Sequence, residues 1–345
     1  VDVKAVSAFL NEENKTISTP SKMEYIDNSQ ATLMSDFSNW GTSPMLTMAP
    51  VITSVGGHVY SSVQTGDHDY EVYSGTSMAA PNFAGTVALM LEYLNRAEKT
   101  GEDGGEIILS NGESGSRTKA EKAELALALL EGTATILTEK DAAGNEFPYS
   151  VRKQGAGLTD LYFAISYYEG SGYIVDPIKE LGDDVEKTGV YSFDVTLAND
   201  NLYGYDCAYY PVSALMFDYV YDYNKGTGKP PLMLNTLTED ILVEGKDYTV
   251  SYTVDGKPIG DTIVVAAGTS CTVNVTIELT AATKAYFDGT FPNGNYIDGY
   301  VWFYDISATA DGDAVYYDAE DNAYAFDDKG AYLLTYDANS NFIPK

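Results

Sequence analysis

The hydrophobic period of this sequence changes near residue 180, and that change limits what the chain can fold into. Before it, apolar residues recur at helical spacing, as at Phe83 and Val87. After it, they alternate as in strands, for example at Tyr191, Phe193 and Val195. Because 345 residues are enough for two domains of ordinary size, we expect an α/β part followed by an all-β part.

Three helices are predicted in the first part. One begins near Met78 with Pro81 in its first turn, where proline costs no hydrogen bond. Its many small residues and few charges suggest that it packs tightly inside a domain. Another begins at a capping box, Thr118 and Glu121, and runs through Leu130. Gly132 lies just past the end of that helix. The third helix is a short one at residues 159–168.

Strands are predicted throughout the second part. Tyr248 to Val254 alternates in the same way and is followed by the turn signal Asp255-Gly256. Tyr300 to Phe303 is another strand-like run. Several strands without a helical period predict a β-sandwich. From about residue 306, Tyr-Asp pairs around polar turns predict additional hairpins.

The charge of the chain is strongly negative, with 51 acidic and 20 basic side chains and a net charge of -31. Such a surface repels phosphate and anionic lipid, which argues against nucleic acid and membrane surfaces as partners. No run approaches the ~20 apolar residues that cross a bilayer, so we expect no membrane insertion. The chain starts at Val1 without a signal-peptide pattern, so we expect a piece of a longer protein or a processed chain.

Two further features of the sequence bear on metal or redox chemistry. Asp318 starts a stretch like a calcium loop, but Ala323 replaces the required glycine and Lys329 occupies the last ligand position, so no metal is expected. Cys207 and Cys271 are too far apart in the sequence for a CxxC site. They are either joined by a disulfide or, for Cys271 in its alternating run, buried as a core thiol.

The strongest candidate for chemistry is the segment Ser74-Gly75-Thr76-Ser77-Met78-Ala79-Ala80-Pro81-Asn82-Phe83-Ala84-Gly85. It places Ser77 on a glycine-containing turn that leads into a helix. The N–H groups and positive dipole at a helix start suit a developing oxyanion. The local pattern alone also fits a serine that merely caps the helix.

This segment resembles the nucleophile signature of the subtilisin-like serine proteases, or subtilases. Two flanking segments agree with the lactocepin and C5a-peptidase-like branch of that family. The first is Met34-Ser35-Asp36-Phe37-Ser38-Asn39-Trp40-Gly41 followed by Pro50, and the second is Arg152-Lys153-Gln154-Gly155-Ala156-Gly157-Leu158. The sequence departs from the family pattern at Asn82, where a histidine is frequent, and at Ser54-Val55, where Ala-Pro is usual.

The resemblance implies a serine endopeptidase that forms an acyl-enzyme on Ser77 and needs no cofactor. Tyr73 and Thr76 would lie at the rim of the cleft for a protein or peptide substrate. The family uses its residues in the order Asp, His, Ser, with an oxyanion Asn between His and Ser. Of these, only Ser77 matches a position here, so we expect the N-terminal part of the same protease to supply the others. The isolated chain is then expected to be inactive.

The two histidines do not offer a local triad. Neither His58 nor His68 lies in the His-Gly-Thr-His helix start of the family. A strand from Tyr70 to Ser74 would separate His68 from Ser77 by roughly 16 Å. We therefore expect both histidines to be loop residues.

The resemblance also implies domain boundaries. Residues 1–20 would be the end of an inserted protease-associated domain, and residues 21–175 the C-terminal part of the catalytic domain. Residues 183–305 resemble the fibronectin-type-III-like sandwich of the C5a-peptidase branch, which leaves 306–345 as an unassigned hairpin tail.

Three functions fit these observations. The first is a secreted or cell-envelope-associated serine endopeptidase. The second is a non-catalytic subtilase-derived module for surface attachment or substrate docking. The third combines the first two: the protease cuts itself, and this chain stays bound to its N-terminal partner.

Overall fold

The computed structural model describes most of the chain from Thr32 to Asp305 and four strands beyond it. The described residues are 32–43, 45–64, 66, 69–97, 117–140, 146–201, 204, 206–230, 233–235, 240–260, 262–291, 294–305, 316–317, 323–327, 330–336 and 342–344. The expected insert end at 1–20 and His68 lie outside the described residues.

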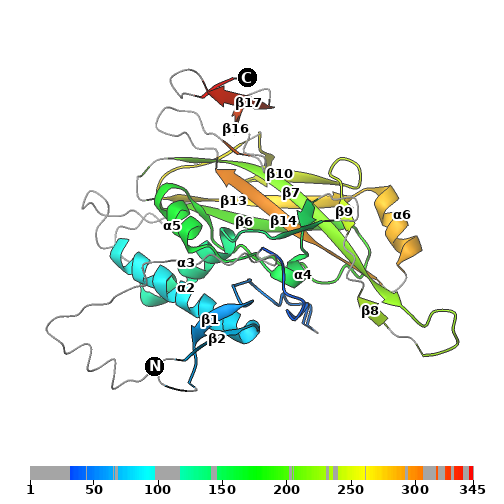
Figure 1. Ribbon diagram of the computed structural model, residues 1–345. Coiled ribbons are helices and arrows are strands. Elements are labelled where there is room, and N and C mark those ends of the chain that lie inside the picture. The colour runs from blue at the N-terminus through cyan, green and yellow to red at the C-terminus, as the bar shows by residue number, and fades with distance from the viewer. Residues whose placement is uncertain are drawn as a thin grey trace.

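The first part of the fold is built on helices that gather on one side of the molecule (Figure 1). They are α2 (Thr76–Ala97), α3 (Lys119–Gly132), α4 (Val151–Gln154) and α5 (Leu161–Gly170). Two small antiparallel hairpins accompany them, β1 (Val59–Ser62) with β2 (Tyr70–Tyr73), and β3 (Thr138–Lys140) with β4 (Glu146–Pro148). Side chains of α2, α3 and α5 form one core, in which Met90, Leu94, Leu129 and Tyr168 are buried. The α/β character predicted for this part is confirmed.

The predicted capping box is present at the start of α3. The Thr118 hydroxyl accepts the Glu121 N–H at 3.3 Å, and the Glu121 carboxylate accepts the Thr118 N–H at 2.7 Å. The hydrogen bond from Thr118 lowers the pKa of Glu121. The helix ends later than predicted and includes Gly132, because the Thr133 N–H still bonds to the Leu129 carbonyl at 3.0 Å.

The prediction that α2 is packed tightly inside a domain is wrong for the described structure. Only Met90 and Leu94 of this helix are buried. One side carries a row of exposed small and apolar residues: Ala80, Pro81, Ala84, Gly85, Ala88 and Leu89. The reason is that α3 and α5 cover one side of α2, while no described element covers the other.

The second part contains two antiparallel sheets, and we call residues 190–305, which form all of their strands except the short β5 (Tyr173–Ile174), the two-sheet unit. One sheet has the order β11-β10-β13-β6-β5, from Lys257–Pro258, Tyr248–Val254, Thr269–Leu279, Val190–Asn199 and Tyr173–Ile174. The other has the order β12-β7-β14, from Ile263–Val265, Cys207–Asp222 and Asn295–Asp305. Strands β8 (Met233–Asn235) and β9 (Asp240–Leu242) also pair with β7, and helix α6 spans Ala281–Thr290.

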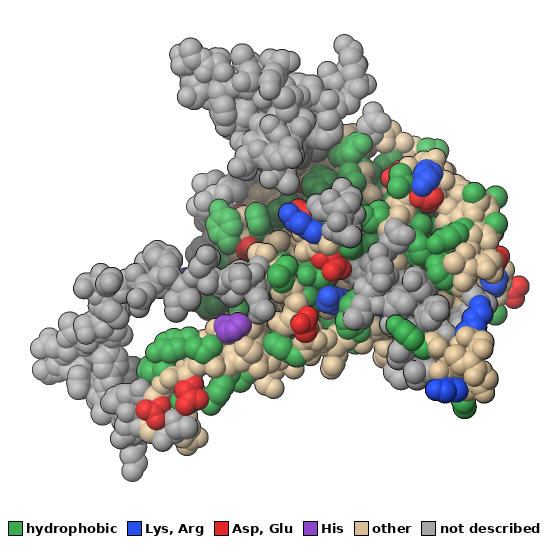
Figure 2. Space-filling view, turned by 45° about the vertical axis from the view of Figure 1, so that its right-hand side comes forward, with side chains coloured by type: hydrophobic (Ala, Val, Ile, Leu, Met, Phe, Trp, Pro, Cys, Tyr) green, Lys and Arg blue, Asp and Glu red, His purple; other side chains and the backbone are tan. Residues whose placement is uncertain are grey.

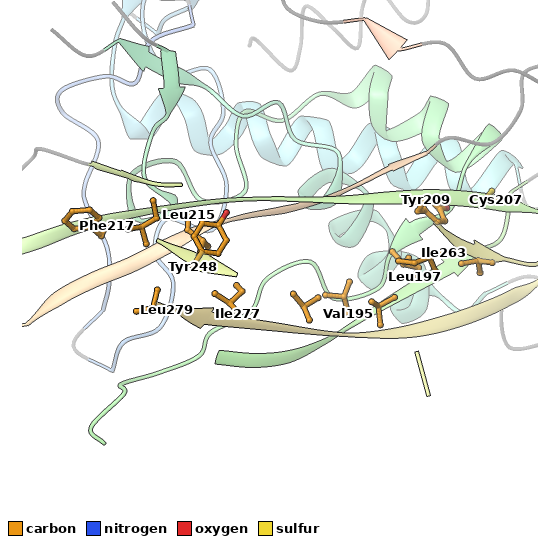
Figure 3. Close-up of a cluster of buried hydrophobic side chains, with 14 of the residues drawn as sticks. Val195, Leu197, Cys207, Tyr209, Leu215, Phe217, Tyr248, Ile263, Ile277 and Leu279 are labelled. Atoms are coloured by element: carbon orange, nitrogen blue, oxygen red, sulfur yellow. The ribbon is translucent and has the colours of Figure 1, made fainter. Parts of the chain in front are cut away.

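The two sheets share one hydrophobic core. In Figure 3, Leu215 and Phe217 on β7 point toward Ile277 and Leu279 on β13. The alternation predicted for β6, β10 and β13 therefore marks real strands, with one residue of each pair turned inward. Cys207 lies in this core and Cys271 at its edge, and no disulfide joins them.

The tail forms the predicted hairpins. Beyond residue 306, four strands make an antiparallel sheet in the order β15-β16-β17-β18. Their bounds are Tyr316–Tyr317, Ala323–Asp327, Gly330–Tyr336 and Phe342–Pro344.

A close backbone approach after α4 requires glycine at position 155. Gly155 has φ +66°, and a Cβ there would lie 2.2 Å from the Val51 carbonyl oxygen. We expect Gly155→Ala to lower the unfolding free energy of the chain by about 3 kcal/mol, measured by urea denaturation. Gly132→Ala is the control, because a Cβ there meets nothing within 4 Å. This substitution should raise the unfolding free energy by about 0.5–1 kcal/mol, since alanine favours the helical backbone of α3 more than glycine does. Equal effects of the two substitutions would contradict the close approach.

Candidate active site

Ser77 is presented to solvent at the start of α2. It is the second residue of the helix, which begins at Thr76, so Ser77 does not hold the N-cap position. Its side chain is exposed and makes no hydrogen bond within the described part of the chain. The hydroxyl is therefore available for chemistry.

The backbone around Ser77 has the geometry of a helix start. The N–H groups of Met78 and Ala79 donate to the Gly75 carbonyl at 3.0 and 3.3 Å. The N–H groups of Thr76 and Ser77 precede the first intrahelical donors, so the helix itself gives them no acceptor. These two groups and the positive end of the helix dipole can stabilise negative charge close to the Ser77 hydroxyl.

The turn before Ser77 rests on a second glycine. The Gly75 N–H donates to the carbonyl of the buried Gly56 at 2.8 Å. A Cβ on Gly56 would lie 2.7 Å from the Gly75 oxygen and 2.9 Å from the Ala79 Cβ. Nearby, the Ser54 hydroxyl donates to the Asn82 side chain at 2.6 Å. Thus Ser54 and Asn82, both departures from the family pattern, contact each other.

The other two predicted site residues flank the turn. Tyr73 ends strand β2 and is 45% exposed, and Thr76 opens α2 with an exposed side chain. The hydrogen bond and the negative charge of Glu71 raise the pKa of Tyr73. Both residues lie within four positions of Ser77 in the sequence and face solvent, and their place at the rim of a cleft stays a prediction.

His58 lies in a bend just before β1 and is exposed. Its backbone N–H donates to the Ser74 hydroxyl at 2.8 Å, so its backbone supports the turn. The expectation that His58 is a loop residue is confirmed, whereas His68 is outside the described residues. The strand expected between His68 and the turn is present as β2.

The structure brings the two motif segments that flank the nucleophile segment into contact. The Gly41 N–H donates to the Arg152 carbonyl at 2.8 Å, and the Thr53 N–H donates to the Gly157 carbonyl at 2.8 Å. Thr53 also pairs with Leu158 in a parallel bridge. The segments before and after the nucleophile motif therefore form one backbone network that supports it.

Two buried polar side chains of the closing segment stabilise this network. Gln154 is fully buried, and its amide donates to the carbonyls of Tyr149 at 2.8 Å and Leu137 at 3.0 Å. Arg152 is buried as well and lies 3.6 Å from the carboxylate of Asp298 on β14. Burial raises the pKa of Asp298, while the Ser150 hydroxyl and Arg152 act in the opposite direction. Sequence reasoning gave Asp298 no role, because its contacts with Ser150 and Arg152 span 146 or more positions and leave no local pattern.

The described residues offer neither a metal site nor a membrane-spanning helix. They hold no group of three or more His, Cys, Asp or Glu side chains arranged for a metal ion. They also include no helix that is both long and apolar enough to cross a membrane.

Comparison with known proteins gives a consistent relationship. Residues 4–156 match the model of the subtilase family. The chain is 25% identical over 290 residues to a C5a peptidase of Streptococcus pyogenes, which covers 84% of this chain and 21% of that protein. It is 26% identical over 287 residues to a PI-type proteinase of Lactococcus lactis subsp. cremoris, which covers 78% of this chain and 12% of that protein. The chain thus spans about a fifth or less of the length of these relatives.

Proposed function

We propose that this chain is part of a serine endopeptidase that uses Ser77 as its nucleophile. Its residues 4–156 match the subtilase family, and its relatives indicate the lactocepin and C5a-peptidase branch of that family. The observation that carries the proposal is the exposed, unbonded hydroxyl at the start of α2. In this reaction the Ser77 oxygen attacks the peptide carbonyl while the general base takes the hydroxyl proton. Collapse of the tetrahedral intermediate breaks the C–N bond, so that the amine leaves with this proton as the acyl-enzyme forms, and water then hydrolyses the acyl-enzyme and frees Ser77. The Ser77 N–H and the helix start stabilise the oxyanion.

The general base and the residue that orients it belong to the N-terminal part of the same protease. The uncovered side of α2 supports this proposal, because Ala80, Ala84 and Leu89 expose apolar surface along the helix that begins at the nucleophile. Figure 2 shows hydrophobic side chains, in green, at several places on the described surface. A protein partner that covers this row would bring its own groups next to Ser77. The isolated chain is then inactive, since loss of the histidine alone costs about 10⁶-fold in kcat in subtilisin.

The other domains follow from the same assignment. Residues 21–175 are the C-terminal part of the catalytic domain, and residues 183–305 are a fibronectin-type-III-like sandwich. The two sheets that share one core support the sandwich. The complete protein is proposed to be secreted or cell-envelope-associated and to act on proteins or peptides without a cofactor.

The test is covalent labelling with a fluorophosphonate, which reacts with activated serines. The complete protease should be labelled, and peptide mass mapping should place the adduct on Ser77. Ser77→Ala should remove the label, and the 345-residue chain alone should not react. Lack of label in the complete protease would refute the proposal and leave the non-catalytic docking module as the function.

A further inference from the structure

The two-sheet unit contacts the catalytic part at the two ends of helix α4. Asp298 and Tyr300 lie two positions apart on β14, so both side chains project from the same face of the strand. The Tyr300 hydroxyl donates to the Gly155 carbonyl at 3.1 Å, just past the end of α4. Asp298 lies at the other end, beside Ser150.

Asp298 is the acceptor for the start of α4. Its carboxylate accepts the Ser150 hydroxyl at 2.6 Å, and the Ser150 oxygen in turn accepts the Arg152 N–H at 3.1 Å. The Asp298 side chain is 17% exposed, and the Arg152 side chain, with its guanidinium 3.6 Å from the carboxylate, is 4% exposed. These contacts are largely shielded from water, which strengthens them and makes α4 hard to displace.

From α4, backbone hydrogen bonds lead to the segment before the nucleophile turn. The Ala156 N–H donates to the Val51 carbonyl at 2.9 Å, and the Thr159 N–H donates to the Thr53 carbonyl at 2.9 Å. The Thr53 hydroxyl also donates to the Gln154 carbonyl at 2.8 Å. Residues 51–53 are therefore held along their whole length by residues 154–159.

The last step connects residues 51–53 to Ser77. Gly56 follows three positions after Thr53, and its carbonyl accepts the Gly75 N–H at 2.8 Å. Gly75 lies two positions before Ser77. Each step after α4 includes a hydrogen bond between two backbone groups, which have no side-chain rotamers to absorb a displacement.

We propose that Asp298 and Tyr300 are positioning residues for Ser77, acting from the two-sheet unit through α4 and residues 51–53. The inference rests on the proposed function, because it assigns these residues to the same nucleophile. Acyl transfer needs the nucleophile in a narrow range of positions, and a displacement of about 1 Å can cost about 10²-fold in rate. A contact that fixes α4 therefore affects the chemical step more than substrate binding.

The test measures hydrolysis and fluorophosphonate labelling in the complete protease. Asp298→Ala and Tyr300→Phe should each lower kcat and the labelling rate by about 10- to 100-fold, while KM changes less than about threefold. Asp298→Asn should restore most of the loss, since its amide oxygen can still accept the Ser150 hydroxyl. In the 345-residue chain, amide hydrogen exchange at residues 74–79 should accelerate with Asp298→Ala.

The matched control is Val275→Ala, which removes a fully buried side chain from the core of the same two-sheet unit. It should weaken folding and leave kcat and exchange at residues 74–79 unchanged, in assays at a temperature where circular dichroism shows every variant folded. Equal losses with Val275→Ala would attribute the effect to general destabilisation and overturn the positioning role. Normal kcat, labelling and exchange with Asp298→Ala would overturn it as well, with the proposed function intact. If the unsubstituted protease takes no label, both proposals fail.

Discussion

Replacement of Ser77 by alanine in the complete protease is expected to lower kcat for peptide hydrolysis by about 10⁶-fold, the loss found when the nucleophile of subtilisin is removed. The reason is that alanine has no oxygen to form the acyl-enzyme. KM should change little, because the substrate contacts and the N–H groups at the helix start remain. Steady-state kinetics with a peptide substrate measure both constants.

The same turn offers a matched control. Ser74 lies three positions before Ser77, but its hydroxyl already accepts the His58 N–H at 2.8 Å. We therefore expect Ser74→Ala to disturb the turn and lower kcat by about tenfold, the equivalent of one lost hydrogen bond. A loss near 10⁶-fold with Ser74→Ala, together with a small loss with Ser77→Ala, would show that Ser74 is the nucleophile and that the assignment to Ser77 is wrong.

Features that depend on neighbouring residues were predictable from the sequence. The capping box of α3 and the alternation of β10 are examples, because each is defined by residues within one element. The turn after β10 is another, since Asp255 and Gly256 adopt the positive φ angles that the Asp-Gly pair favours. Local physics also identified Ser77 at a helix start but left capping and catalysis open, and only the family resemblance favoured catalysis.

Features that depend on distant residues were not predictable. The exposed side of α2 was expected to be buried, because its small residues suit tight packing, but composition does not say whether a partner is present. The contacts of Asp298 with α4 join residues 146 or more positions apart. Such pairing follows from the three-dimensional arrangement of β14 and α4, and neither segment alone carries a sign of it.

A second buried ion pair joins the two parts of the molecule. Arg117, just before α3, pairs with Asp200 at the end of β6, with their side chains 8% and 0% exposed. The Asp200 carboxylate also accepts the Tyr173 hydroxyl at 2.9 Å, and Arg117 donates to the Tyr168 hydroxyl at 3.3 Å. Removal of one partner from such a pair leaves the other charge buried without compensation.

We therefore expect Arg117→Ala to lower the unfolding free energy of the 345-residue chain by about 3–5 kcal/mol. Arg96→Ala is the control, because Arg96 pairs with Glu92 on the surface, with side chains 72% and 58% exposed, and such pairs contribute less than about 1 kcal/mol. Replacing both partners, as in Arg117→Met with Asp200→Leu, should recover most of the loss, since no buried charge remains.

Urea denaturation measures these effects separately in the two parts, because the sequence has one tryptophan in each. Trp40 lies in the first part of the fold and Trp302 on β14, so variants that retain one of them report on one part at a time. With Arg117→Ala, both transitions should move to lower urea concentration, because the pair contributes to the stability of both parts. A change below about 1 kcal/mol in both would mean that the buried pair does not hold the parts together.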